Sequence, residues 1–203
     1  MATLGPAHRI TTRTVKGATP DSVVLVGGGD PTLTTRPNAR QSNGRPAYAS
    51  LPDLARQTAN ALKAQGIRQV RVDYDASAYT GPRQAHGWKP NYLPDGELAS
   101  PSALTVDAGL ENPGNPHDRD RVSDPAKSAT GTFARLLTRN GVEARPGRST
   151  TAPRQAAQLG AVQSPTAAEL VEHLMTESDN DVAEAMARQV ALASGRPGTF
   201  ADA

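Results

Sequence analysis

The residues whose types and spacing could support chemistry are Ser178 and Asn180, which flank Asp179 within the stretch 164–192. Apolar residues recur at three- and four-residue spacing on both sides of this Ser-Asp-Asn triplet, which predicts two buried helices with a break between them. On one continuous helix, residues two apart point to roughly opposite sides, whereas in an irregular turn both side chains can face one cleft. The break therefore predicts that the Ser178 hydroxyl and the Asn180 amide share a site. The apolar positions are Ala167, Leu170, Val171, Leu174 and Met175 before the triplet, and Val182, Met186, Val190 and Ala193 after it.

A purely structural role for the triplet is also open. Ser and Asp are preferred N-caps, so the Ser178 side chain could accept a hydrogen bond from the backbone of Asp181. Asp179 and Asp181 would then lie at the positive end of the second helix. The two roles are compatible, because a hydroxyl can cap a helix and still face a cleft.

Ser-Asp-Asn is one of three motifs of the serine enzymes that react with penicillins, and the other two are Ser-x-x-Lys and Lys-Thr-Gly. Neither of these occurs in the 203 residues. Ser123 and Lys127 are one residue too far apart, and a Lys four residues on is a different geometry from the i, i+3 pair in which the amine can activate the hydroxyl. The nearest match to Lys-Thr-Gly is 127–129, which lies before the triplet and within a predicted helix.

Three stretches, in this order, resemble the D-alanyl-D-alanine carboxypeptidases of the penicillin-binding-protein 4 type, peptidase family S13. They are LGPAHRITTRTV leading into SVVLVGGGDPTL, the segment from Gly87-Trp88-Lys89-Pro90 to Ser102-Ala103-Leu104, and MTESDNDVAEAMARQVA. In that family the nucleophile motif precedes the GGGDP segment, and Lys-Thr-Gly follows Ser-Asp-Asn. The resemblance therefore implies an interior fragment whose two missing motifs lie outside residues 1–203.

The resemblance also implies a function, which is acylation of a serine by a peptidoglycan stem peptide, followed by hydrolysis, with β-lactams as mimics of the substrate. Endopeptidase activity can accompany it. Ser178 would pass protons between the nucleophile, the general-base Lys and the leaving amine, and Asn180 would bind the substrate amide. Asp179 would brace the turn. The parent protein is expected to be extracytoplasmic and to need no cofactor. The alternative is a non-catalytic relative that serves as a cell-wall binding or structural module.

Composition narrows the remaining classes. Aromatic residues make up 3% of the chain and the mean hydropathy is −0.53, so the core depends on Val, Leu and Ala. Cysteine is absent, which excludes disulfides, thiolate catalysis and cysteine metal sites. The net charge is only +2 and the basic residues are scattered, which argues against a nucleic-acid-binding protein. The start, MATLGPAHRI, has no apolar core of the kind a signal peptide needs, so any export signal would lie in other sequence.

The elements that must position the triplet follow a repeated order of helix, glycine and strand. A helix over 50–65 leads to a strand over 70–74, and a helix over 124–139 precedes a glycine and Val142. Residues 4–15 and 23–26 are predicted strands, and 145–158 is polar with room for an edge strand. This order predicts a mixed α/β fold. With the resemblance, it is interpreted as an inserted α/β domain (residues 1–159) and a helical part of a serine β-lactamase/transpeptidase-like domain (residues 160–203).

Three other features have ordinary structural explanations. Gly27-Gly28-Gly29 after a strand could cradle a phosphate, but the following Asp30 and Pro31 bring a carboxylate and remove an amide, so a tight turn is the better interpretation. Trp88 lies in an irregular segment, where a large ring usually serves as a packing anchor. His117 with its neighbouring aspartates lacks the partner spacing of a metal site.

Overall fold

The chain forms one mixed five-stranded sheet with strand order β4-β3-β2-β1-β5. The computed structural model describes residues 3–37, 47–115 and 117–203. Strands β2, β3 and β4 are parallel, whereas β1 is antiparallel to both β2 and β5. The elements are β1 (Arg9–Lys16), β2 (Ser22–Val26), α1 (Leu51–Ala64), β3 (Gln69–Asp75), a short turn (Asp107–Gly109), α2 (Pro125–Arg139), β4 (Glu143–Ser149), β5 (Gln158–Thr166), α3 (Ala167–Glu177) and α4 (Asn180–Ala193).

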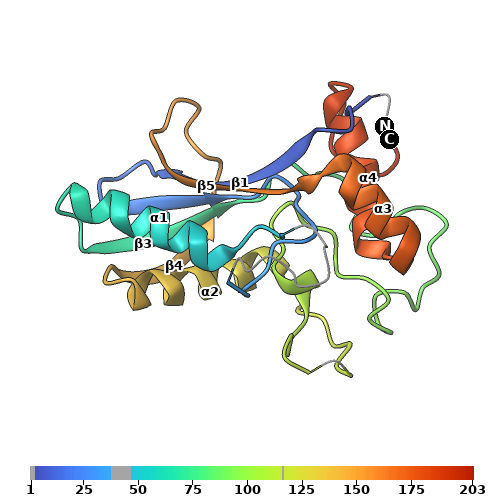
Figure 1. Ribbon diagram of the computed structural model, residues 1–203, viewed down its shortest axis with the longest axis horizontal. Helices are drawn as coiled ribbons and strands as arrows, with labels where there is room; N and C mark the ends of the chain where they lie inside the picture. Colours follow the sequence, from blue (N-terminus) through green and yellow to red (C-terminus); the bar gives the residue numbers. More distant parts are fainter. Residues whose placement is uncertain (1–2, 38–46, 116) are drawn as a thin grey trace.

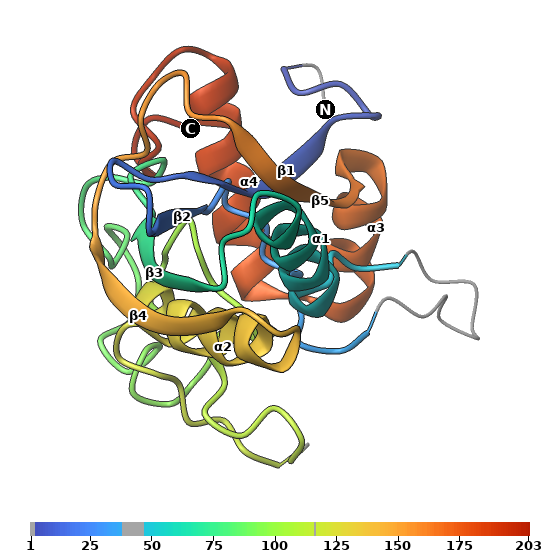
Figure 2. The same cartoon turned by 90° about the vertical axis from the view of Figure 1, so that its left-hand side faces the viewer.

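Helices α1 and α2 lie side by side on one face of the sheet (Figures 1 and 2). Each begins where the sequence indicates, because the Ser50 hydroxyl accepts a hydrogen bond from the Asp53 amide at 3.3 Å and the Asp124 carboxylate accepts one from the Lys127 amide at 3.0 Å. The main core lies between these helices and the sheet. Its fully buried side chains include Leu25, Leu51, Leu54, Val72, Phe133 and Leu137.

The predicted mixed α/β class is confirmed. The predicted strands 23–26 and 70–74 lie next to each other, paired in parallel from Ser22 opposite Arg71 to Val26 opposite Asp75. The predicted edge strand is also present, as β4, which pairs with β3 alone. Strand β4 contains Pro146 and Gly147 and is mostly exposed, which explains why its sequence looks like a loop.

Strand β5 was not predicted, although residues 164–166, at the start of the stretch that carries the triplet, belong to it. They complete β5, which pairs with β1. The strand was not predicted because the segment contains Gly160 and Pro165, and both residue types are uncommon in strands. At Gly160 the glycine is needed for packing, because a Cβ atom there would lie 3.0 Å from the Cβ of Gln57 on α1. The division between residues 1–159 and 160–203 stays a prediction, and β5 begins before it and ends after it.

Helices α3 and α4 stand beyond the end of the sheet at which β1 begins and β5 ends (Figure 1). Thr166, the last residue of β5, caps α3 and forms a capping box with Glu169. The two helices share a small second core with β1, made of Ile10, Ala167, Leu170, Val182 and Met186. Among the described residues, no helix has the length and apolar character needed to span a membrane.

Candidate functional site

The Ser-Asp-Asn triplet lies at a two-residue break between α3 and α4, as the periodicity predicts. Ser178 ends α3 in the left-handed conformation, with φ 54° and ψ 43°. Asp179 is the N-cap of α4, because its carboxylate accepts a hydrogen bond from the Val182 amide at 3.1 Å. Its second oxygen lies 3.0 Å from Nε2 of His173. The expectation that Ser178 caps the second helix is therefore wrong, since the cap is Asp179, which braces the turn from both sides.

The structure leaves Ser178 and Asn180 at the surface of this break. Both side chains are exposed. The Asn180 amide donates a hydrogen bond to the carbonyl of Glu97 at 3.3 Å, and so touches a segment that lies 83 residues earlier in the chain. That the two side chains act together in one cleft stays a prediction.

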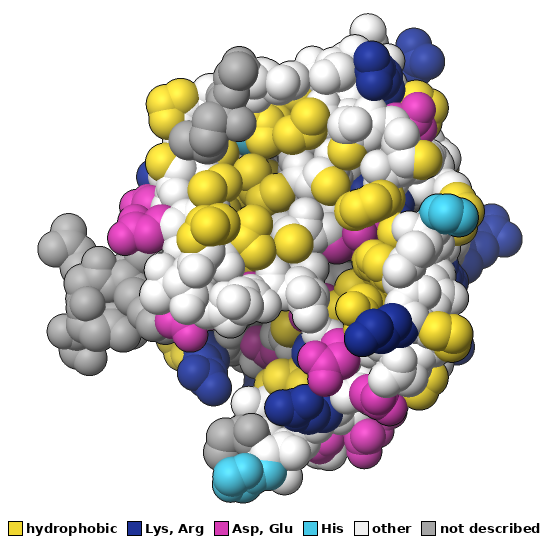
Figure 3. All heavy atoms as spheres, turned by 90° about the vertical axis from the view of Figure 1, so that its right-hand side faces the viewer, with side chains coloured by type: hydrophobic (Ala, Val, Ile, Leu, Met, Phe, Trp, Pro, Cys, Tyr) yellow, Lys and Arg dark blue, Asp and Glu magenta, His cyan; other side chains and the backbone are white. Residues whose placement is uncertain are grey.

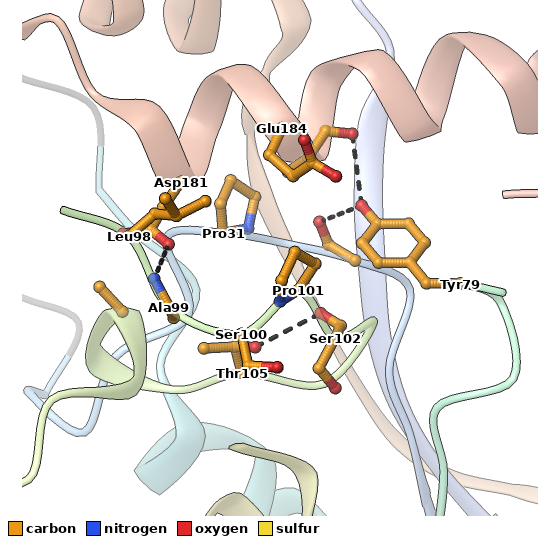
Figure 4. Close-up of a pocket in the computed structure, with 13 residues that line it drawn as sticks. Pro31, Tyr79, Leu98, Ala99, Ser100, Pro101, Ser102, Thr105, Asp181 and Glu184 are labelled. Carbon is orange, nitrogen blue, oxygen red and sulfur yellow. Dashed lines mark hydrogen bonds between the residues drawn. The ribbon is translucent and has the colours of Figure 1, made fainter. Parts of the chain in front are cut away.

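Asp181, directly after the triplet, is turned inward. Its carboxylate accepts a hydrogen bond from the Ala99 amide at 2.8 Å (Figure 4). Its other oxygen lies 3.6 Å from Arg121. Burial raises the pKa of Asp181 to about 6, although the Ala99 hydrogen bond and the Arg121 charge act to lower it. Sequence reasoning missed this residue as a functional candidate, because an Asp in the first turn of a helix is usually a simple electrostatic partner of the helix dipole.

A small pocket of about 30 Å³ lies beside this carboxylate (Figure 4). It is lined by the segment after β2, by residues from 98–108 and by the first two turns of α4, together with Tyr79. A space of this size holds only water-sized groups. Its walls include Gly29, Pro31, Tyr79, Ser102, Asp181 and Glu184.

The glycine segment 27–29 after β2 packs closely against other parts of the chain. The Gln189 amide donates to the Gly28 carbonyl at 2.8 Å, and the Tyr79 hydroxyl donates to the Gly29 carbonyl at 3.1 Å. Gly29 has φ 95°, and a Cβ atom on it would lie 2.2 Å from the Tyr79 hydroxyl. Because residues 31–37 form turns and not a helix, the segment also lacks the strand–loop–helix order of a phosphate-binding loop. The structure therefore gives no support to a phosphate-binding loop. The predicted tight turn is not at the glycines themselves, because residues 27–30 form no turn and the turn residues that follow are Pro31 and Thr32.

Asp30, directly after the glycines, is buried. Its Oδ1 accepts hydrogen bonds from the amide of Thr32 at 2.8 Å and from its hydroxyl at 2.7 Å, while Oδ2 has no hydrogen-bond partner among the described residues. Burial raises the pKa of Asp30 from 3.8 to about 6, against the lowering effect of the Thr32 hydrogen bonds. The folded protein therefore binds this proton more tightly than the unfolded chain does.

We expect Asp30→Asn to remove part of the pH dependence of stability. In the unchanged protein, the Asp30 contribution to the free energy of unfolding should fall by on the order of 3 kcal/mol as pH rises from about 4 to above 6. Asp181 has the same sign and adds to the fall. Urea midpoints of both proteins between pH 4 and pH 7 measure this effect. The variant should gain stability relative to the unchanged protein as pH rises, whereas parallel curves would mean that Asp30 does not titrate in this range.

Farther along α4, Glu184 and Arg188 form a buried ion pair at 2.7 Å, with 6% and 2% of their side chains exposed. The Arg188 guanidinium also donates to the carbonyls of Thr80, Pro82 and Gly198 and lies over the Tyr79 ring, 5.3 Å from its centroid. This pair fixes the segment after β3 and the C-terminal segment to α4.

The remaining sequence candidates have partners in their own segments. Trp88 is half-buried and its ring meets that of Tyr92, with centroids 6.4 Å apart. The Asp118 carboxylate accepts hydrogen bonds from Asn112 and from the Asp120 amide. Within the described ranges, His, Cys, Asp and Glu side chains form no group of three that could hold a metal ion.

The helical end of the molecule carries a gathering of hydrophobic side chains on its surface (Figure 3). On helix α3, 77% of Met175 is exposed, and Val171 and Leu174 are half-buried against the second core.

The chain is similar to known carboxypeptidases over its whole length. The protein family described as "D-Ala-D-Ala carboxypeptidase 3 (S13) family" matches residues 1–115 and 114–203. Carboxypeptidase Rv3627c of Mycobacterium tuberculosis is 36% identical over 205 residues, covering 100% of this chain and 42% of the relative. Carboxypeptidase DacB of Mycolicibacterium smegmatis is 39% identical over 184 residues, covering 89% and 38%. The chain thus spans about two fifths of the length of these relatives.

Solved structures show the same fold. Penicillin-binding protein 4 (dacB) from Haemophilus influenzae superposes with a TM-score of 0.72 at 17% identity, over 99% of this chain and 56% of that one. A second structure of that protein, complexed with a novel β-lactam, gives a TM-score of 0.61 at 17% identity, over 98% and 56%. The resemblance noted in the sequence is therefore confirmed, and the chain belongs to the D-Ala-D-Ala carboxypeptidase 3 (S13) family.

Proposed function

We propose that residues 1–203 are part of a serine-type D-alanyl-D-alanine carboxypeptidase that acts outside the cytoplasm on peptidoglycan stem peptides. The observation that carries the proposal is the match of the family to the whole chain, together with the position of Ser-Asp-Asn at an exposed break between two helices. Neither Ser-x-x-Lys nor Lys-Thr-Gly occurs in the chain. We therefore infer that the nucleophile and its base belong to sequence that flanks this chain. The complete protein is this chain together with that flanking sequence.

In the proposed reaction, the nucleophilic serine attacks the carbonyl carbon of the penultimate D-Ala. The bond to the terminal D-Ala breaks, its amine takes up a proton, and water then hydrolyses the acyl-enzyme. Ser178 would hand the proton between the nucleophile, the general-base Lys and the leaving amine. Asn180 would hold the substrate amide in place. A β-lactam would acylate the same serine, and cleavage of cross-links as an endopeptidase would use the same steps.

The proposed arrangement in the complete protein is an α/β domain inserted into a catalytic domain. The sheet with α1 and α2 would form the inserted domain, while α3 and α4 would be the part of the catalytic domain that carries Ser178 and Asn180. The core of α3 and α4 is separate from the main core of α1, α2 and the sheet, which supports this division, and Ile10 of β1 packs in that second core and links the two parts.

A fluorescent penicillin tests the proposal. We expect the complete protein to give a labelled band that survives boiling on a denaturing gel, and residues 1–203 alone to give none, because loss of nucleophile and base together removes covalent catalysis. A labelled band from residues 1–203 would place a nucleophile within this chain. An unlabelled complete protein with the correct fold would favour a non-catalytic cell-wall module.

A further inference from the structure

Arg121 lies at the meeting point of three segments close to the triplet. Only 16% of its side chain is exposed. Its Nε and Nη2 donate to the Gly96 carbonyl at 3.3 and 3.1 Å, and its Nη1 donates to the Ala108 carbonyl. The same guanidinium faces Asp181 on α4, with Nη2 3.6 Å from the carboxylate. One side chain thus joins the segment 96–99, the turn 107–109 and the start of α4.

The turn that Arg121 contacts has an unfavourable backbone. Asp107, Ala108 and Gly109 have φ angles of 49°, 52° and 68°, so two residues with side chains adopt the left-handed region in succession. Such a conformation persists only where surrounding contacts hold it. Those contacts come from Arg121 on the Ala108 carbonyl and from the Asp107 carboxylate, which accepts hydrogen bonds from the hydroxyls of Thr34 and Thr35.

The segment 96–99 is held from two sides. Arg121 binds the carbonyl of Gly96, while Asp181 binds the amide of Ala99. Between these two contacts, the carbonyl of Glu97 accepts the hydrogen bond from Asn180. The segment 96–99, which contacts the Asn180 side chain, is therefore fixed by Arg121 and Asp181, and these two side chains also face each other.

We infer that Arg121 and Asp181 form a brace that positions Asn180 for acylation. The inference rests on the proposed function, and it makes both residues positioning residues, since their side chains are mostly buried and contact the segment 96–99. A planar guanidinium with five donors can serve Gly96, Ala108 and Asp181 at once, whereas the point charge of a lysine cannot. A small displacement of a group that orients substrate can cost a large factor in rate.

The test uses Arg121→Met and Arg121→Lys in the complete protein, with Arg119→Met as the matched control. Arg119 also pairs with an acidic residue of the same segment, Glu97 at 3.4 Å, but 72% of its side chain is exposed. We expect both Arg121 variants to lower the rate of penicillin acylation per folded molecule by roughly tenfold or more, and the control to change it less than twofold. The Lys variant keeps the charge, and so provides a second folded variant if Met disrupts folding.

A double-mutant cycle with Asn180→Ala separates positioning from a general effect on the fold. If the brace acts through Asn180, then adding an Arg121 substitution to Asn180→Ala should lower the rate less than twofold further. A fall by the full product of the two single effects would overturn the inference, as would an unchanged rate in both Arg121 variants.

Amide hydrogen exchange keeps this inference distinct from the proposed function. In residues 1–203, without any catalysis, the Ala99 amide should exchange faster in the Arg121 variants and in Asp181→Asn than in Arg119→Met. Unchanged exchange at Ala99 would show that the brace does not hold the segment. If Ala99 exchanges faster in the variants but penicillin does not acylate the complete protein, then the brace is confirmed. The proposed function, and with it the role of the brace in acylation, is then rejected.

Discussion

Replacing Arg188 with Met should lower the free energy of unfolding by about 3–5 kcal/mol, the cost of leaving one partner of a buried ion pair without the other. The Glu184 carboxylate would remain in a nearly buried site, where burial already raises its pKa. Three backbone carbonyls, of Thr80, Pro82 and Gly198, would lose their donor as well. Urea unfolding at pH 7, followed by circular dichroism, measures the loss.

The matched control is Arg56→Met, which removes a helical Arg–Asp pair at 3.3 Å whose arginine side chain is 59% exposed. This change should cost less than about 1 kcal/mol. Replacing Glu184 and Arg188 together by Leu and Met should recover part of the loss, because no unpaired charge is left in the interior. If Arg188→Met and Arg56→Met lower the free energy of unfolding equally, then burial of the Glu184–Arg188 pair makes no difference to stability.

Substitution of the triplet should affect the rate of acylation in the complete protein. Ser178→Ala and Asn180→Ala should each slow penicillin acylation by on the order of 10²-fold or more, since one removes a proton-transfer group and the other a group that orients the substrate. The stability cost should be small for both. Ser178 accepts no capping hydrogen bond from α4, and the Asn180 side chain is exposed. The acylation rate and the urea midpoint should be measured on the same samples.

Two further variants separate chemistry from structure at this break. Ser178→Gly also removes the hydroxyl, but glycine is the favoured residue in a left-handed position after a helix, so it should hold or raise stability while losing the same rate. Asp179→Ala should do the reverse, costing roughly 0.5–2 kcal/mol through loss of the cap. A normal rate in both Ser178 variants would mean that the hydroxyl takes no part in acylation.

The elements that could be predicted are those whose signals are local. Helices α1 and α2 have a capping residue, a proline at the start, a regular apolar stripe and a glycine just beyond the C-cap, and all of these are legible in sequence. The break at Ser178 was legible for the same reason, since two apolar stripes stop and restart around it. Which residue caps α4 was not, because Ser178 and Asp179 are both good caps and only the left-handed backbone of Ser178 decides between them.

The features that could not be predicted depend on contacts between distant segments. Arg121 stands in a polar stretch typical of a solvated loop, and its partner Asp181 is 60 residues farther along the chain. Glu184 and Arg188 have the i, i+4 spacing of an ordinary surface pair, yet the loops that return across α4 bury them. Strand β5 contains Gly160, which argues against a strand in the sequence, and the reason for a glycine there is seen only where α1 packs against β5.

The direct passage from β5 into α3 has a mechanical consequence. Thr166 ends the strand and caps the helix, and β5 is itself paired with β1, so the junction has no flexible residues that could absorb a rotation. We expect the helical pair to move with the sheet as one stiff unit, because β5 continues directly into α3. Any opening of the surface beside Ser178 would then have to come from movement of other segments and not from the junction between β5 and α3.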